Sequence, residues 1–133
     1  MTMMNLIIFS GLIFPIIKND MKLEINSKKF DVHLEENITA KSFVDKLPIK
    51  VNMKDLNGNE KYYYLDFSLK TKPVKVNQIN AGDIMLFGDN CIVIFYKSFN
   101  TSYSYTKIGS IINPRNLEET LGSTDVTVTF KYD

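Results

Sequence analysis

The stretch IMLFGDNCIVIFY, residues 84–96, decides the fold of this chain. It contains two apolar runs, residues 84–87 and 91–96, separated by the turn-forming triplet Gly88-Asp89-Asn90. Continuous apolar runs of this length, bounded by turn residues, are typical of strands that are covered on both faces. We therefore predict a central β-hairpin over residues 84–96 that forms the core of the domain.

Apolar residues on either side of this hairpin mostly recur at every second position, which is the period of a half-buried strand. The segments that show this alternation are residues 23–25, 30–34, 49–53, 61–65 and 126–132. The polar turn 26–28 joins the first two into a hairpin, and Asn57-Gly58, which accepts positive φ, joins the next two. The last segment closes the sheet or barrel, and the domain is predicted to be mainly β.

A first short helix is predicted over residues 40–47, where apolar side chains recur at helical spacing. Asn37 or Thr39 is its candidate N-cap, and Pro48 prevents its continuation. The apolar stripe of this helix suits the open end of a barrel.

A second short helix is predicted to begin at Pro114, behind the N-cap Asn113, and to end at Gly122. Leu117 and Leu121 form its apolar i, i+4 pair. The two helices interrupt an otherwise β-strand pattern.

Size and charge limit the functions that this chain can have. Its 133 residues indicate one domain. Its formal net charge of +1 predicts no nucleic-acid partner. The single cysteine, Cys91, and the single histidine, His33, cannot form an internal disulfide or a Cys/His zinc site. We expect no metal and no cofactor.

Residues 6–17, LIIFSGLIFPII, form an apolar run near the N-terminus. The run is shorter than the roughly 20 residues of a membrane-spanning helix, so no membrane span is expected. It lacks the preceding Lys or Arg of a secretory signal. We assign residues 1–20 to an apolar leader or arm outside the barrel, with Met21 as an alternative start, and residues 21–133 to the domain. A cytoplasmic location is favoured, and an extracytoplasmic one follows if residues 1–20 act as a signal segment.

Five segments are informative in their order and spacing: residues 36–48, 55–62 (DLNGNEKY), 81–86 (AGDIML), 91–99 (CIVIFYKSF) and 101–109 (TSYSYTKIG). Taken together, they resemble the small bacterial cyclophilin-like domains. The resemblance covers residues 21–132. It implies a closed cyclophilin-like β-barrel with two short helices, in a family mostly uncharacterised in function.

The resemblance also raises an alternative function, a weak peptidyl-prolyl cis-trans isomerase. Cyclophilins use an arginine guanidinium beside an apolar-aromatic pocket, and the one arginine here, Arg115, lies outside the barrel strands. Lys61 offers positive charge, but a mobile ammonium does not replace a planar guanidinium. Cys91 opens a strongly apolar strand, which favours a core thiol over a nucleophile. We therefore predict no catalytic residues.

One segment carries more aromatic and hydroxyl side chains than a connection between strands requires: YKSFNTSYSYT, residues 96–106. Tyrosine buries a large area at low entropic cost, and Ser, Thr and Asn adapt their hydrogen bonds, so the mixture suits a binding surface. Alternatively, Phe99, Tyr103 and Tyr105 fold back over the barrel mouth and serve only packing. The residue pattern leaves both interpretations open.

The tyrosine triplet at residues 62–64 presents the same choice, because strand alternation separates its middle ring from the other two. If both tyrosine groups border one cleft, Glu60 and Lys61 are the nearest charged residues. The resemblance places residues 94–96 at a pocket wall. The predicted ligand-binding residues are Glu60, Lys61, Tyr62, Phe95, Tyr96, Phe99, Thr101, Tyr103 and Tyr105. We predict a non-catalytic binding module for a peptide or small molecule, present as a monomer or weak dimer.

Overall fold

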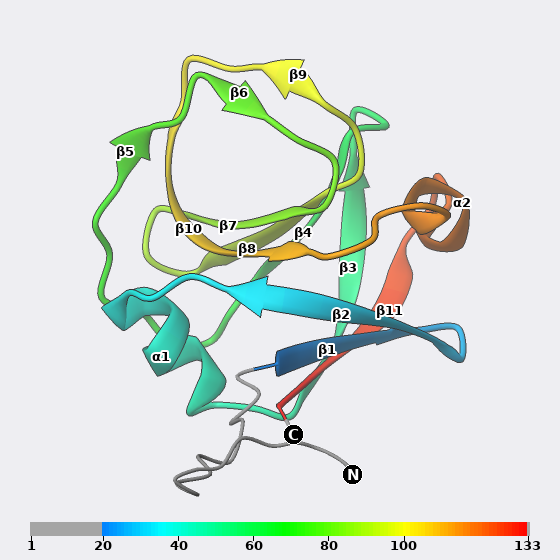
Figure 1. Cartoon of the computed structure of the whole chain (residues 1–133), viewed down its shortest axis with the longest axis horizontal. Coiled ribbons are helices and arrows are strands. Elements are labelled where there is room, and N and C mark those ends of the chain that lie inside the picture. The colour runs from blue at the N-terminus through cyan, green and yellow to red at the C-terminus, as the bar shows by residue number, and fades with distance from the viewer. Residues whose placement is uncertain (1–19, 133) are drawn as a thin grey trace, which may run out of the picture.

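The computed structural model describes residues 20–132, so the predicted leader lies outside the described residues except for Asp20. Figure 1 shows how its strands and helices are arranged. The elements are β1 (Asp20–Ile25), β2 (Lys28–Leu34), α1 (Ile38–Val44), β3 (Ile49–Leu56), β4 (Glu60–Tyr64), β5 (Val74–Lys75), β6 (Gln78–Ile79), β7 (Asp83–Phe87), β8 (Cys91–Phe95), β9 (Phe99–Asn100), β10 (Ser104–Ile111), α2 (Leu117–Leu121) and β11 (Val126–Tyr132).

Eight antiparallel strands close into a barrel in the order β2-β1-β11-β3-β4-β8-β7-β10, and β10 pairs back with β2. The short strand β5 adds to the end of β10, and β6 pairs with β9 in a separate two-stranded sheet. The predicted fold, a mainly β closed barrel with two short helices, is confirmed. The C-terminal strand β11 lies between β1 and β3, while the β2–β10 pairing joins the two ends of the strand order.

The three predicted hairpins are confirmed. They are the pairs β1–β2, β3–β4 and β7–β8, all antiparallel. In the second hairpin Asn57 and Gly58 adopt φ values of 57° and 64° at the two central positions of a β-turn, in which the N–H of Asn59 donates to the carbonyl oxygen of Leu56. Every residue of β7 and β8 is buried except Phe87, so the central hairpin is covered on both faces.

Among the eight barrel strands, β10 is the one that the sequence pattern did not predict. Its alternation is interrupted by a register shift between Lys107 and Gly109, where it pairs with β7. Gly109 allows the barrel to close, because a Cβ there would lie 2.6 Å from the carbonyl oxygen of His33 on β2. The two long connections between barrel strands also carry short strands, because residues 97–106 contain β9 and the start of β10 and residues 70–80 contain β5 and β6.

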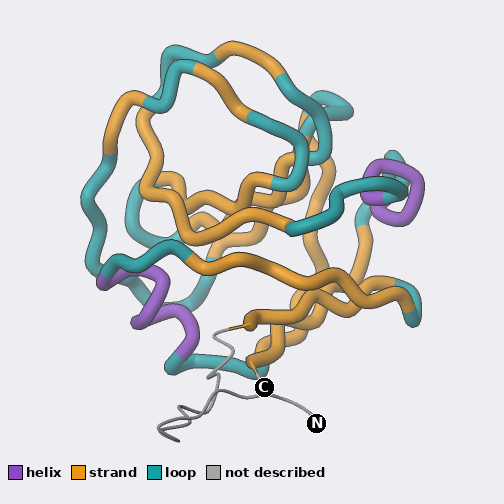
Figure 2. The backbone as a smooth tube through the Cα atoms, in the orientation of Figure 1, coloured by secondary structure: helices purple, strands orange, loops and turns teal. Residues whose placement is uncertain are grey.

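The barrel wall separates two apolar clusters. The larger cluster fills the barrel and takes buried residues from seven of the eight barrel strands and from both helices, with Tyr63 of β4 packed against it. The smaller one lies on the outer side, where β6 and β9 arch over β7 and β8 (Figure 2). It consists of Ile79, Met85, Cys91, Val93, Phe95 and Tyr105, with Tyr62, Val76 and Phe99 packed against it. The long connections thus cover the outer face of the wall rather than the barrel mouth.

The helices begin and end slightly differently from the prediction. Asn37 caps α1 by accepting a hydrogen bond from the N–H of Ala40 at 2.8 Å, and Phe43 packs edge-on against Phe130 in the barrel core. The helix α2 begins at Leu117 rather than Pro114, because Asn116 adopts φ 70° and Asn113 accepts a hydrogen bond from the N–H of Arg115 in a preceding turn. Within residues 20–132 no helix has the length and apolar character needed to cross a membrane.

Candidate ligand-binding pocket

Neighbouring residues on β4 and β8 lie on opposite sides of the barrel wall. Lys61 is fully buried and Tyr63 packs on the inner cluster, whereas Tyr62 packs on the outer one. Tyr96 belongs to the inner cluster, whereas Phe95 belongs to the outer one. The two-residue period of a strand therefore divides the predicted site residues between two environments.

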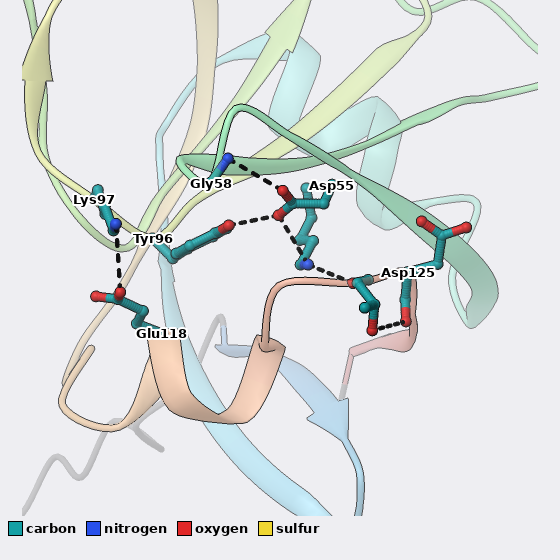
Figure 3. Close-up of polar contacts among 8 residues, drawn as sticks. Asp55, Gly58, Tyr96, Lys97, Glu118 and Asp125 are labelled. Atoms are coloured by element: carbon teal, nitrogen blue, oxygen red, sulfur yellow. Dashed lines mark hydrogen bonds and ion pairs between the residues drawn. The ribbon is translucent and has the colours of Figure 1, made fainter.

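Lys61 is the centre of a polar network on the inner side, whose Asp55 and Tyr96 side chains are shown in Figure 3. Its Nζ donates to Oδ1 of Asp55 at 3.0 Å and to the carbonyl oxygen of Thr124, and lies 5.5 Å from the centroid of the Tyr96 ring. The Tyr96 hydroxyl donates to the same Asp55 oxygen, and the Gly58 N–H donates to Oδ2 at 3.1 Å. The buried ammonium thereby has two hydrogen-bond acceptors and lies over an aromatic ring.

The protonation states of this network favour a structural role. Burial raises the pKa of Asp55, but hydrogen bonds from Tyr96 and Lys61 outweigh it and hold that pKa below its ordinary value of 3.8. Burial and the hydrogen bond to Asp55 raise the pKa of Tyr96 well above its ordinary value. Asp55 is therefore ionised at neutral pH, and Tyr96 keeps the proton that it donates.

A pocket of about 420 Å³ lies on the outer side of the wall, which is within the size range of small-molecule sites. Its lining residues are Leu56, Asn57, Asn59, Glu60, Tyr62, Tyr64, Phe87, Cys91, Val93, Phe99, Thr101, Tyr103 and Tyr105. They come from the β3–β4 hairpin, the β7–β8 hairpin and the segment from β9 into β10. Six of the thirteen are aromatic, and one is charged.

Ring packing fixes the deeper aromatic side chains of this pocket. The fully buried Phe95 ring lies 5.6 Å from Phe99 and 5.5 Å from Tyr105, centroid to centroid. Burial and the nearby charge of Glu60 raise the pKa of Tyr105 to about 12 and that of the Cys91 thiol to about 11. Both groups are neutral at physiological pH, so the thiol is not an activated nucleophile.

Tyr103 differs from the deeper rings because it is 62% exposed. Its ring contacts Phe87 at 6.0 Å, and its N–H donates to the Thr101 hydroxyl at 3.1 Å. The N–H of Thr101 donates to the carbonyl oxygen of Asn77, which ties this segment to the neighbouring connection. The backbone of Tyr103 is thus held in place while its ring stays open to solvent.

Glu60 is the one charged residue in the pocket lining, and it is partly buried. Among residues 20–132, none forms a hydrogen bond or ion pair with its carboxylate. Burial, and then the negative charge of Asp55, raise the pKa of Glu60. The pocket therefore holds a carboxylate whose charge the described part of the chain does not neutralise.

The structure divides the nine predicted binding residues into six and three. Those that line the outer pocket together are Glu60, Tyr62, Phe99, Thr101, Tyr103 and Tyr105. Lys61 and Tyr96 do not line it, because strand alternation directs both into the inner network. Phe95 does not line it either, because its ring is covered by Phe99 and Tyr105. These three residues therefore lie outside this pocket, and the binding role of all nine residues stays a prediction.

Several pocket residues were not predicted from the sequence. Tyr64 shares a face with Tyr62, and Cys91 and Val93 share a face on β8, so strand alternation could have identified them. No such signal marked Phe87, at the end of β7, or the residues around the β3–β4 turn, Leu56, Asn57 and Asn59. They enter the pocket only because the two hairpins lie side by side.

The other chemically active side chains lie elsewhere. Arg115 is exposed in the turn before α2 and borders a different depression, together with Lys28 and Lys29. His33 is exposed on β2. Within residues 20–132 no group of three or more His, Cys, Asp or Glu side chains is placed to hold a metal ion.

Comparison with known proteins supports the barrel and defines its family. The chain is similar to the hypothetical protein AF2241 of Archaeoglobus fulgidus, whose solution structure superposes with a TM-score of 0.58 at 19% sequence identity. That match covers 86% of this chain and 95% of the archaeal one, and it shows a shared fold. No curated protein matches the chain.

The family assignment rests on a match to a family model rather than on the structural likeness. The model described as the cyclophilin-like family matches residues 23–131, which is nearly the whole described domain. The resemblance to bacterial members of such a family suggests a bacterial origin for the chain, which stays a prediction. The chain belongs to the cyclophilin-like family.

Proposed function

We propose that this protein is a non-catalytic binding module that takes a small molecule or a peptide segment in the outer pocket. The observation that carries the proposal is the convergence of six aromatic side chains and one carboxylate, from three separate segments, on a single cavity. Rigid aromatic side chains with a few polar groups are the usual lining of binding sites.

The chemical character of the lining favours binding over catalysis. Its thiol and its most buried phenol are held neutral by raised pKa values. Arg115, which the isomerase alternative would need beside the aromatic pocket, borders a separate depression. Lys61, which could supply a positive charge, is committed to Asp55 and Thr124 on the inner side.

An NMR titration with small aromatic ligands and short peptides tests the proposal. The amide signals of Glu60, Thr101, Tyr103 and Tyr105 are expected to shift with one common dependence on ligand concentration. The amide of Arg115 serves as a control for non-specific effects, because it lies outside the pocket. Shifts confined to Arg115 and its neighbours, or independent responses of the pocket segments, would exclude a single outer binding site.

A coupled isomerase assay on an X-Pro peptide tests the alternative function. We expect no acceleration over the uncatalysed reaction, which takes tens to hundreds of seconds at 25 °C. Arg115→Ala is the control variant. Acceleration that survives this substitution would assign catalysis to another donor and would overturn the non-catalytic proposal.

A further inference from the structure

Glu60 differs from the other buried or partly buried acidic residues near it. Asp55 accepts hydrogen bonds from Tyr96, Lys61 and Gly58. The buried Asp83 accepts a hydrogen bond from the N–H of Asn80 and lies 3.6 Å from the ammonium of Lys107. Both carboxylates therefore have the partners that burial of a charge requires, while Glu60 has none among residues 20–132.

The inner face of the same hairpin shows what would complete the outer pocket. There a carboxylate and a tyrosine ring surround a cation, since Lys61 pairs with Asp55 and lies over Tyr96. The outer pocket repeats two of these three groups, with Glu60 as the carboxylate and Tyr62, Tyr64, Tyr103 and Tyr105 as the tyrosines. The positively charged member is missing from its lining residues.

The lining chemistry also argues against the other charge classes of ligand. An anion would meet the carboxylate of Glu60 without a lysine or arginine from the lining to balance it. A neutral apolar ligand would pack on the rings but would bury the carboxylate further without a partner, which costs free energy. A cation is stabilised both by the carboxylate and by the electron-rich aromatic rings.

We propose that the outer pocket binds a small organic cation, an ammonium or guanidinium group with apolar substituents, for which Glu60 is the counter-ion. This inference rests on the proposed function, because it names the ligand class of the same pocket. The volume of about 420 Å³ accommodates a small molecule, and the exposed Tyr103 ring packs on its apolar part. The charged group of the ligand lies beside the carboxylate of Glu60, the first residue of β4.

Matched ligand pairs test the charge requirement in the full chain. Choline is compared with its neutral isostere 3,3-dimethylbutan-1-ol, and benzylamine with benzyl alcohol, by NMR titration. We expect each cation to bind about tenfold or more tightly than its neutral partner, and to shift the amides of Glu60 and Tyr103. Acetylated tripeptides with a central lysine or norleucine provide the peptide arm.

Glu60→Gln is the diagnostic variant, because it keeps the shape of the side chain and removes the charge. The advantage of each cation over its neutral partner is expected to disappear in Glu60→Gln. It should persist in the control Glu36→Gln, which removes an exposed carboxylate outside the pocket. The unfolding midpoint of each variant shows that the fold is retained.

The outcomes separate this inference from the proposed function. Neutral and cationic probes that bind the pocket equally, with or without the Glu60 charge, would overturn the cation assignment and leave a binding module. Failure of every probe to shift the pocket amides would overturn both. Binding of the lysine tripeptide without binding of either free cation would overturn the assignment to a small molecule.

Discussion

Asp55 and Glu60 lie on either side of one hairpin turn, yet their surroundings are opposite. Asp55 faces inward, accepts hydrogen bonds from three groups and has a lowered pKa. Glu60 faces the outer pocket, has no hydrogen-bond partner among residues 20–132 and has a raised pKa. The comparison shows that one barrel wall carries a carboxylate held by hydrogen bonds on its inner side and, on its outer side, a carboxylate without such partners among residues 20–132.

The largest effect is expected from breaking the inner ion pair. Lys61→Met keeps most of the aliphatic packing but leaves Asp55 and the Thr124 carbonyl without their buried donor. Removing one partner of a buried ion pair costs about 3–5 kcal/mol, and urea unfolding measures it as a lower free energy of unfolding. Lys54→Met, at a side chain 63% exposed, is the control and should change stability by less than about 0.5 kcal/mol. A similar small loss for Lys61→Met would show that the inner network is not structural.

A smaller loss of stability is expected from Tyr96→Phe. This variant keeps the ring beneath Lys61 and removes the hydroxyl that donates to Asp55. Loss of a hydrogen bond to a charged group costs about 1.5–3 kcal/mol, and the pKa of Asp55 should rise toward its ordinary value. Urea unfolding and an NMR titration of the Asp55 carboxyl measure the two effects. An unchanged Asp55 pKa would place the hydroxyl outside the network.

Asp55 and Glu60 should contribute to the free energy of unfolding with opposite dependences on pH. The pKa of Asp55 is lowered in the folded protein, so the ionised carboxylate stabilises the fold above pH 3.8, the ordinary pKa of the group. This stabilisation is lost as the pH falls through the pKa of the folded state. Because the pKa of Glu60 is raised, its protonated form favours folding, and that contribution is lost as pH rises from 4.5 through the folded value.

Two variants separate these contributions in unfolding free energies measured across the acid range. Asp55→Asn is expected to remove the loss of stability that occurs as the pH falls through the folded-state pKa of Asp55. Glu60→Gln is expected to remove the loss of stability that begins as the pH rises above 4.5. The same slope in both variants and the wild type would contradict the opposite environments of the two groups.

The smallest effect on stability is expected from removing the N-terminal segment. All the barrel strands and both helices lie within residues 20–132. A chain that starts at Met21 should therefore unfold cooperatively, with a free energy within about 0.5 kcal/mol of the full chain, in thermal and urea unfolding. Loss of the cooperative transition would make the apolar segment part of the core and would remove its assignment as a leader outside the barrel.

The sequence predicts most of this fold because most of its strands keep a regular period. The hairpins around Asn57-Gly58 and over residues 84–96 combine apolar periodicity with turn residues, and the structure has both. The strand β10 does not follow this rule, because its register shift near Gly109 breaks the alternation where β2 and β10 approach closely. Barrel closure is a long-range property, so local periodicity could not reveal it.

The pocket was less predictable than the fold because composition does not give side-chain direction. Aromatic richness identified Tyr62, Tyr103 and Tyr105, which line the pocket. It also suggested Tyr96, and nearness in sequence to the tyrosines suggested Lys61, but both side chains point inward. Phe87 was missed because its place in the pocket depends on the packing of separate hairpins.

The affinity of Tyr103→Ala tests most directly the claim that the outer face binds a ligand while the inner face supports the barrel. With the tightest probe from the NMR titrations, the account predicts weakening by about 2 kcal/mol, or roughly 30-fold, as for an anchoring aromatic contact. The unfolding midpoint should be nearly unchanged, because the Tyr103 ring is 62% exposed. An unchanged affinity together with a stability loss of about 3 kcal/mol would instead make this ring part of the core and would contradict the account.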